Sequence, residues 1–444
     1  MKKISAAAGT DVTLNVSIHG DKELTGTIKT NTSKNGAVGL LCASILNRGI
    51  TILHQVPQIE EVNRLLEVLA SIGMKVEWRG STLVLTPPKT YQLHKIDRPA
   101  AMRTRSIVMF IGALIHSLET FSLPQSGGCK LGSRTVRPHF FALENFGVKI
   151  KTTEHDYEVS YRAKRPAEII LYESGDTVTE NALLAAALTP STTVIKYASA
   201  NYMVQEMCVF LQKLGVQIDG IGTTTLTVTG LKEIKEDIEY TLAEDPTDSM
   251  FFIAAALVTN SQITITRAPI DFLELELLTL KKMGMRYEQS KPYLSHNQQC
   301  RLVDLVIKKS KLVAPPEKVH SRPYPGLNAD NLPFFAVIAT QTKGQTFIHD
   351  WMYEKRAIYF TELDKLGAET VLADPHRIFI NGPTPLHSNE LVCPPALRPA
   401  TILLIGMLGA KGHSVLRNIY SINRGYERLV KRLQSLGADI KYIK

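Results

Sequence analysis

Several features are scarce or missing in this chain of 444 residues. Its longest apolar stretches, 107–114 and 250–258, fall well short of the ~18 residues that a membrane-spanning helix needs. Lys2 and Lys3 precede a short run of small residues, but Asp11 soon interrupts it, so the sequence shows no convincing signal-peptide core. We therefore expect a cytoplasmic protein that does not bind membranes.

Cysteine is also sparse. The five residues of this type are Cys42, Cys129, Cys208, Cys300 and Cys393. They form no CxxC pair and no metal-ligand spacing, which is typical of free thiols in a reducing compartment. Aromatic residues make up 7% of the chain, and Lys and Arg are not bunched into long basic runs, so a stacking platform for nucleic acid is not evident. The net charge of +9 still favours anionic partners, either nucleic acids or small phosphates.

The strongest positive feature is internal repetition. Six segments share an amphipathic helical pattern that runs into a glycine and then into a short strand. The six glycines are Gly73, Gly147, Gly215, Gly284, Gly367 and Gly437. Each stands where a left-handed residue would end a helix. A further strand is expected upstream of most copies, at 48–56, 191–198, 260–269, 343–351 and 411–419. The sequence therefore predicts six copies of one mixed α/β unit.

The repeats divide naturally into three and three. The segment 231–249 is charged and carries a proline, as expected where a chain crosses between domains. A strand at 14–18 precedes the first full unit and could complete the sixth. We therefore expect one discontinuous domain, 1–33 with 245–444, and an inserted domain, 34–244. Ligand sites commonly lie between such domains.

Polar residues near the starts of apolar helices are the candidate functional groups. On their own, Lys34, Asn35, Arg105, Asp330, Arg398 and Arg424 could each be a cap or a solvated side chain. Together they are harder to dismiss, because cations recur at helix starts, where backbone N–H groups also attract anions. Cys129 follows two glycines and precedes Lys130 and Arg134, which would favour a thiolate or a bound anion. A lone cysteine is otherwise more often a small core residue.

These residues carry a family resemblance. SKNGA around Lys34, RSIVMFIGAL, SLPQSGGCKLGSR around Cys129, YPGLNAD, YEKR, ALRPA and INRGYERL together resemble the enolpyruvyl transferases, in order and over nearly the whole chain. The resemblance implies a mixed α/β (α+β) fold of two domains, each an inside-out α/β barrel of three βαβαββ-type repeats. It places the active site in the interdomain cleft. It implies no metal or organic cofactor, and a monomer is the favoured state.

The resemblance also implies substrates and residue roles. The substrates would be phosphoenolpyruvate and UDP-N-acetylglucosamine, whose 3-hydroxyl accepts the enolpyruvyl group. Lys34, Arg134 and Arg424 would bind the phosphate and carboxylate of phosphoenolpyruvate, joined by Arg105 and Arg398. Arg103 is the less favoured neighbour of Arg105. Cys129 would protonate the methylene carbon, and Asp330 would accept the proton of the hydroxyl. Asn35 and Arg356 would hold the nucleotide sugar and its phosphates.

Some stretches depart from the family pattern. They are Tyr172–Asn181, Ala198–Met207 and Ala396, and they bear on the acceptor more than on phosphoenolpyruvate. An enolpyruvyl transferase with another acceptor, shikimate 3-phosphate or a nucleoside, therefore stays open. Cys129 and Asn35 argue against the shikimate version. A non-catalytic relative that binds anions or nucleic acid is the alternative from a different class.

Overall fold

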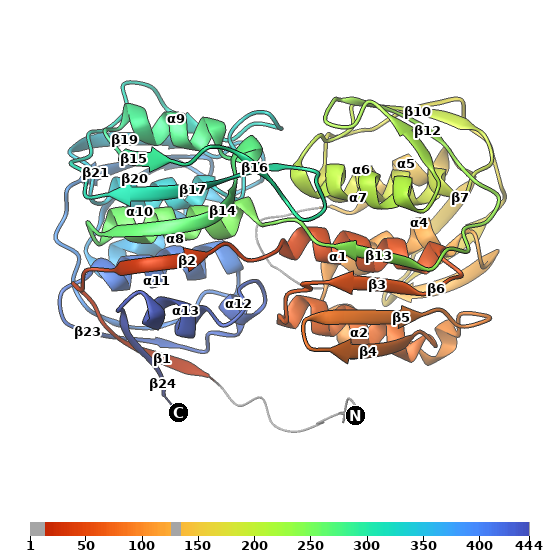
Figure 1. The fold of residues 1–444 in the computed structure, drawn as a ribbon, viewed down its shortest axis with the longest axis horizontal. Helices are drawn as coiled ribbons and strands as arrows, with labels where there is room; N and C mark the ends of the chain where they lie inside the picture. The colour runs from red at the N-terminus through yellow and green to blue at the C-terminus, as the bar shows by residue number, and fades with distance from the viewer. Residues whose placement is uncertain (1–13, 126–134, 444) are drawn as a thin grey trace.

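The structure is a computed structural model that describes residues 14–125 and 135–443 (Figure 1). Two hydrophobic cores divide the chain. One is built from residues between 37 and 242, and the other from residues 16–28 and 250–440. We call the first part of the chain the inserted half and the second the terminal half; they lie side by side in Figure 1. We propose that they correspond to the two domains expected from the sequence, 34–244 and 1–33 with 245–444.

Each half holds three small sheets. In the inserted half their strand orders are β13-β3-β5-β4, β6-β8-β7 and β11-β12-β10-β9. The strands are β3 (Thr51–His54), β4 (Lys75–Arg79), β5 (Thr82–Thr86), β6 (Thr120–Pro124), β7 (Val148–Thr152), β8 (Asp156–Tyr161), β9 (Glu168–Ile170), β10 (Thr192–Lys196), β11 (Gln217–Asp219), β12 (Thr225–Thr229) and β13 (Ile238–Thr241). All but the β9–β10 and β3–β13 pairs within these sheets are antiparallel.

The terminal half repeats this plan. Its strand orders are β22-β23-β1-β24, β15-β17-β14-β2 with β16 beside β17, and β18-β19-β21-β20. The strands are β1 (Asn15–His19), β2 (Thr25–Lys29), β14 (Gln262–Pro269), β15 (Arg286–Gln289), β16 (Tyr293–Leu294), β17 (Arg301–Lys308), β18 (Val319–His320), β19 (Gly344–His349), β20 (Glu369–Asp374), β21 (Arg377–Gly382), β22 (Glu390–Val392), β23 (His413–Arg417) and β24 (Asp439–Ile443). The five strands expected upstream of the repeat helices are all present, as β3, β10, β14, β19 and β23.

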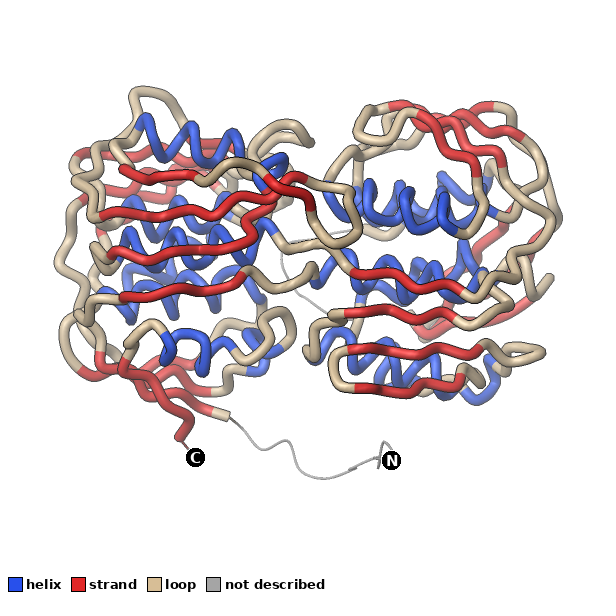
Figure 2. Tube along the Cα trace, in the orientation of Figure 1, coloured by secondary structure: helices blue, strands red, loops and turns tan. Residues whose placement is uncertain are grey.

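Three helices pack together at the centre of each half, and strands flank the helices (Figure 2). They are α1 (Lys34–Ala43), α4 (Phe110–Leu114) and α6 (Asp176–Ala187) in the inserted half, and α8 (Pro246–Val258), α10 (Leu332–Ala339) and α11 (Leu397–Gly409) in the terminal half. Every residue of α4, α8 and α10 is buried. Helices that are apolar on all sides need such a central position. In the described part of the chain, no helix combines the length and the hydropathy required to cross a bilayer.

The amphipathic repeat helices form a second set around these centres. They are α2 (Glu60–Ser71), α5 (Arg137–Glu144), α7 (Tyr202–Lys213), α9 (Glu274–Lys282), η5 (Ala357–Leu366) and α13 (Leu429–Ser435). Shorter elements are η1 (Ser44–Leu46), η2 (Leu93–Lys95), α3 (Arg98–Met102), η3 (Arg105–Met109), η4 (Ile270–Phe272) and α12 (Tyr420–Asn423). The fifth repeat helix, η5, is a 3-10 helix instead of an α-helix. Its consecutive β-branched and aromatic residues at 358–361 disfavour the α-helix.

The six repeat glycines end their helices as expected. Their φ angles lie between +87° and +109°, a region that side-chain-bearing residues rarely adopt. After Gly73 the backbone N–H of Met74 turns back to the carbonyl of Leu69 at 3.0 Å, as in a helix that closes with a left-handed residue. The predicted helix–glycine–strand unit is therefore confirmed at all six positions.

The chain passes between the halves in two adjacent segments. The backbone N–H of Ser33 donates to the carbonyl of Ala243 at 2.8 Å, and that of Asp245 donates to Asn31 at 2.8 Å. These bonds tie the segment between β2 and α1 to the segment between β13 and α8. The early strand β1 pairs antiparallel with β23 and β24, so it completes the sixth unit as the sequence predicted.

Candidate active site

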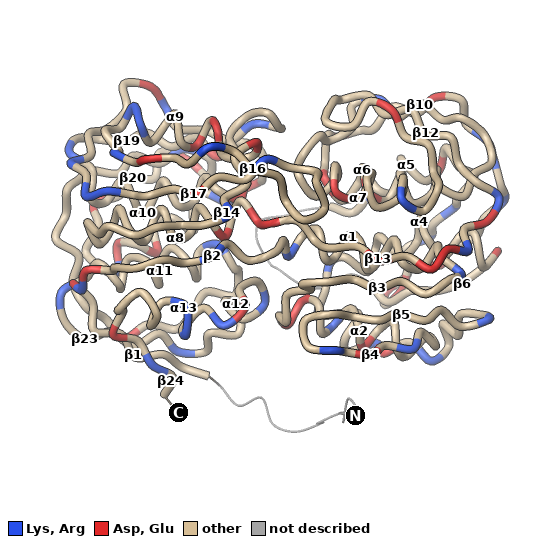
Figure 3. Tube along the Cα trace, viewed as in Figure 1, with Lys and Arg blue, Asp and Glu red and all other residues tan. Residues whose placement is uncertain are grey.

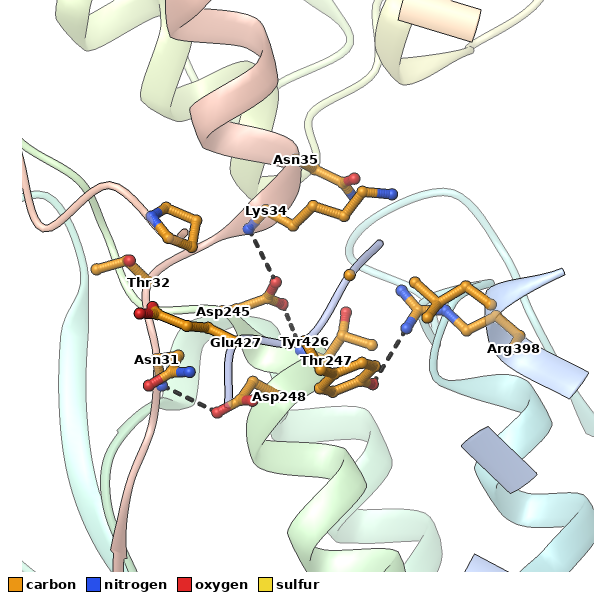
Figure 4. Close-up of a pocket in the computed structure, with 13 residues that line it drawn as sticks. Asn31, Thr32, Lys34, Asn35, Asp245, Thr247, Asp248, Arg398, Tyr426 and Glu427 are labelled. Carbon is orange, nitrogen blue, oxygen red and sulfur yellow. Dashed lines mark hydrogen bonds between the residues drawn. The ribbon is translucent and has the colours of Figure 1, made fainter. Parts of the chain in front are cut away.

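The two halves enclose a cleft of about 420 Å³, within the ~300–1,000 Å³ usual for small-molecule sites. The inserted half contributes Arg105 and the start of α6, and the terminal half contributes Tyr324 and Asp330. A smaller polar pocket lies where the chain crosses between the halves, and Lys34, Asn35, Arg398 and Tyr426 line it (Figure 4). Because Arg398 in the small pocket binds Asp330 in the cleft, we treat the two as one site.

Lys34 is the first residue of α1. The hydroxyl of Ser33 caps this helix and accepts the backbone N–H of Gly36 at 2.8 Å. The backbone N–H of Lys34 itself donates to the carboxylate of Asp245, on the other crossing segment, at 3.3 Å. The crossing segments therefore fix where the lysine side chain enters the pocket, as Figure 4 shows.

The side chain of Lys34 belongs to a cluster of charges, and Figure 3 shows residues of both signs where the two halves face each other. Burial lowers its pKa from the ordinary value, and Arg424 and Arg398 act in the same direction. Glu61 and Asp330 oppose this shift. Two arginines from the terminal half thus surround a lysine from the inserted half. Such a set has the geometry and charge to hold an anion with more than one negative group.

Glu61 links the halves across this cluster. It lies in the first turn of α2, and its carboxylate accepts the Nε–H of Arg424, which follows α12, at 2.8 Å. The other carboxylate oxygen accepts the hydroxyl of Thr104 at 2.6 Å. Burial raises the pKa of Glu61, but Lys34, Arg424 and Thr104 outweigh that effect and lower it below the usual value. Glu61 is therefore an ionised carboxylate held among the cations.

Asp330 stands before α10 and faces α11 from the same half. Its Oδ2 accepts an N–H of Arg398 at 2.9 Å, and the other terminal nitrogen of Arg398 donates to the Tyr426 hydroxyl at 3.2 Å. Burial would lower the pKa of Arg398, but Asp330 and Tyr426 raise it above its ordinary value. The arginine therefore stays charged and holds the Asp330 carboxylate at the wall of the cleft.

Asn35 and Arg105 occupy the side of the site that belongs to the inserted half. The amide of Asn35 donates to the hydroxyl of Tyr202 at 3.0 Å. Arg105 starts η3, lines the cleft, and donates to the backbone carbonyl of Thr135 at 2.9 Å. Arg103 is exposed and is not among the residues that line the cleft.

Arg356 is not where the sequence analysis expects it. Its side chain is 1% exposed, pairs with the buried carboxylate of Asp350 at 3.0 Å through a terminal nitrogen, and also bonds the carbonyl of Ala329 at 2.7 Å. It also stacks over the Tyr353 ring at 4.8 Å. The guanidinium is thus held inside the terminal half, and Arg356 is not among the residues that line the described cleft. Its contact with Ala329 instead supports the neighbouring Asp330.

Two predicted residues, Cys129 and Arg134, lie outside the described residues, and their roles stay predictions. Glu61 is the group that the sequence analysis missed. A signal for it exists, because Glu61 shares the helix face of Leu65 and Val68, at spacings of four and seven. A carboxylate on the apolar face of an amphipathic helix requires a buried partner.

Comparisons with known proteins agree with this arrangement. Residues 18–433 match the family model described as EPSP synthase (3-phosphoshikimate 1-carboxyvinyltransferase). The chain is 34% identical to a UDP-N-acetylglucosamine 1-carboxyvinyltransferase of Treponema denticola, covering 96% of this chain and 98% of that protein. It is 31% identical to the protein of the same name in Treponema pallidum, with 95% and 98% covered.

Solved structures show the same fold. The enolpyruvyl transferase NikO of Streptomyces tendae superimposes with a TM-score of 0.83 at 23% identity, covering 97% of this chain and 99% of that chain. An EPSP synthase of Acinetobacter baumannii gives a TM-score of 0.73 at 16% identity, with 97% and 100% covered. At these identities the likeness concerns the fold of the two halves.

Proposed function

The chain belongs to the EPSP synthase family, and from that premise we propose that it transfers the enolpyruvyl group of phosphoenolpyruvate to the 3-hydroxyl of UDP-N-acetylglucosamine, with release of phosphate. This reaction is the first committed step of peptidoglycan precursor synthesis. The names of relatives at 34% and 31% identity over nearly the full length support this acceptor. The observation that carries the proposal is the cation cluster of Lys34, Arg398 and Arg424 beside the Asp330 carboxylate.

The cluster suits phosphoenolpyruvate, which carries a phosphate and a carboxylate on neighbouring atoms. Lys34 and Arg424, with Arg134, bind these two groups, and Arg105 and Arg398 complete the cationic wall. A hydrogen bond to a charged group contributes about 1.5–3 kcal/mol, and an arginine can bind two oxygens at once. Before substrate enters, the Glu61 carboxylate neutralises part of this charge and holds Arg424 in place.

The proposed reaction has an addition and an elimination. Asp330 accepts the proton of the sugar 3-hydroxyl while the hydroxyl oxygen bonds to carbon 2 of phosphoenolpyruvate. Cys129 delivers a proton to carbon 3. The resulting tetrahedral intermediate then returns a proton from carbon 3 to the Cys129 thiolate and loses the phosphate from carbon 2, which leaves the enol ether. The departing phosphate takes up the proton held by Asp330. Cations beside the phosphate stabilise its departure. Asp330 is well placed for the first step because Arg398 fixes its orientation.

The remaining assignments rest on position. Asn35 contacts the nucleotide sugar from the inserted half, and Arg356 acts by holding the segment that carries Asp330. We propose that the protein works in the cytoplasm as a monomer. Residues of one chain form the described cleft, and the four described cysteines are buried free thiols, as in a reducing compartment.

A different acceptor is the second candidate, and the start of α6 favours it. Glu173 and Asp176 bring two carboxylates to the cleft there, and Asp176 accepts bonds from Ser199 at 2.5 Å and Asn201 at 3.2 Å. These residues fall in the two stretches that depart from the family pattern. Carboxylates at this position make the binding of a diphosphate less favourable.

Product analysis distinguishes the acceptors. The purified protein is incubated with phosphoenolpyruvate and, separately, with UDP-N-acetylglucosamine, shikimate 3-phosphate or UMP, and the products are identified by mass spectrometry. The proposal expects the enolpyruvyl ether only in the first mixture. An ether formed only with UMP or shikimate 3-phosphate would support enolpyruvyl transfer but show that the acceptor is not UDP-N-acetylglucosamine. No ether in any mixture would refute the enzymatic proposal.

A further inference from the structure

A second hollow lies at the other end of the inserted half. It measures about 1,050 Å³, and we call it the far recess. It is lined by five segments that are distant in sequence: Leu46 with Arg48, and residues 115–119, 161–165, 188–190 and 232–234. Three of these segments, at 46–48, 115–119 and 188–190, lie after the carboxyl ends of the central helices α1, α4 and α6, and the other two follow the strands β8 and β12. The active-site cleft uses the amino-terminal ends of α1 and α6, so α6 alone, at 12 residues, separates the two sites by ~18 Å.

The far recess collects positive charge. Five cations line it, namely Arg48, Arg162, Lys164, Arg165 and Lys232, against two carboxylates, Glu119 and Glu233. Within residues 14–125 and 135–443, no ion pair joins any of the five to a carboxylate. Bringing like charges into one hollow is unfavourable unless an anion enters with them.

The helix ends explain only part of this charge. The carboxyl end of a helix carries a partial negative charge and favours a nearby cation. None of the three central helices has a basic residue in its own last turn. Three of the five cations instead come from one connection, the segment 162–167 between β8 and β9. The partial negative charge at the three helix ends therefore does not account for five cations, three of which come from one connection.

Arg48 adds an independent sign of a missing partner. One terminal nitrogen donates to the Ser117 hydroxyl at 2.8 Å, and the guanidinium lies over the Tyr91 ring at 5.6 Å. The other terminal nitrogen is buried and has no hydrogen-bond partner among the described residues. A buried unpaired N–H of a charged group is destabilising, so Arg48 is held beside the far recess with part of its hydrogen-bonding capacity unused.

The floor of the far recess is apolar and aromatic. Leu46, Ile115 and Leu188 line it, and the Tyr161 and His116 rings meet edge to face at 6.3 Å. Burial lowers the pKa of His116 to about 4, so this ring is neutral near pH 7 and adds no charge. A cationic rim over an aromatic floor matches a ligand with phosphates at one end and a flat ring at the other.

We infer that the far recess is a second ligand site, separate from the cleft, that binds a nucleotide through its phosphates and its base. The phosphates bind the cations of the 162–165 segment with Arg48 and Lys232, and the base lies on the floor beside Tyr161. Free phosphate and pyrophosphate carry the negative charge that the cations would bind, but they lack the base that would lie beside Tyr161.

The test is calorimetric titration of the full-length protein with ATP, in the presence of saturating phosphoenolpyruvate so that the cation cluster of the cleft is filled. Arg162→Ala combined with Arg165→Ala removes two exposed cations of the far recess. The matched control is Lys149→Ala with Lys151→Ala, which removes the same charge from exposed positions of β7 outside the recess. Unchanged melting temperatures verify that both variants fold.

We expect the recess variant to bind ATP at least about tenfold more weakly than the wild type, since two charge-assisted contacts are lost. The control variant should bind normally, and both should keep wild-type turnover. Pyrophosphate should bind the wild type more weakly than ATP. Equal losses in the two variants, pyrophosphate binding as tight as that of ATP, or a wild type that does not bind ATP would each overturn the inference.

Discussion

Asp330→Asn is the substitution that isolates the proposed base. The side chain keeps its size and retains one oxygen that can accept the N–H of Arg398, now 2.9 Å from the carboxylate. It loses the negative charge and the ability to take a proton from the acceptor hydroxyl. The change therefore separates a role in proton transfer from a role in holding Arg398.

The structure predicts a large effect of Asp330→Asn on turnover and a small effect on the free energy of unfolding. General base catalysis contributes about 10²–10⁴ in rate, so turnover should fall by at least about 10², or about 2.7 kcal/mol in the barrier. The Asp330 side chain is 30% exposed, and its bond to Arg398 changes from charged to neutral without being lost. We therefore expect a loss of only about 1 kcal/mol in the free energy of unfolding.

Steady-state phosphate release gives kcat and KM, and a urea titration gives the free energy of unfolding. The matched control is Asp374→Asn, which alters another aspartate–arginine pair of the same half, with Arg377, away from the cleft. The control should keep wild-type turnover. If Asp330→Asn keeps turnover within threefold of the wild type, or loses activity only because it unfolds, Asp330 is not the base.

Three further predictions follow from buried charges and from the cysteine loop. Glu61→Gln removes the carboxylate that pairs with Arg424, so the free energy of unfolding should fall by about 3 kcal/mol. Added phosphate should raise the melting temperature more in the variant than in the wild type. Equal shifts in melting temperature would contradict anion binding by the cation cluster. A phosphonate epoxide that mimics phosphoenolpyruvate should alkylate Cys129 in preference to the other cysteines, and Cys129→Ser should abolish the label; peptide mass spectrometry showing even labelling would reject this. Burial raises the pKa of Glu206 from 4.5 to about 8, so the native state keeps a proton that the unfolded chain releases, and stability should fall by up to about 1.4 kcal/mol per pH unit as pH rises through that window. Glu206→Gln should flatten that pH dependence in urea titrations, and an unchanged slope would show that Glu206 ionises normally.

Features governed by local geometry could be predicted from the sequence. A glycine that ends a helix needs only its own positive φ, and the same pattern at Gly73 and at Gly437 identified the repeat without any knowledge of contacts. The sequence also predicts that the strand at 14–18 completes the sixth unit, because it precedes the first full unit of the repeat. Charges at helix starts, such as Lys34 and Arg398, were identifiable because a helix start fixes where the side chain emerges.

The direction of long side chains could not be predicted in the same way. Arg356 stands in a motif that suggests a ligand contact, yet Asp350 draws its guanidinium into the core, and only the packing of the terminal half shows this. Glu61 and Arg424 are more than 360 positions apart in the chain, so their pairing depends on how the two halves meet. The lining of the far recess likewise comes from five separate segments.

Acceptor-dependent phosphate release tests the central proposal most directly. The purified protein is mixed with phosphoenolpyruvate, and free phosphate is followed with and without UDP-N-acetylglucosamine, with Arg424→Ala as the inactive control. We predict steady release only when both substrates are present, and at least about 10² less in the variant, which loses a charged contact to phosphoenolpyruvate. Phosphate release at the same rate with and without UDP-N-acetylglucosamine, or no phosphate release when it is present, would contradict the proposed function.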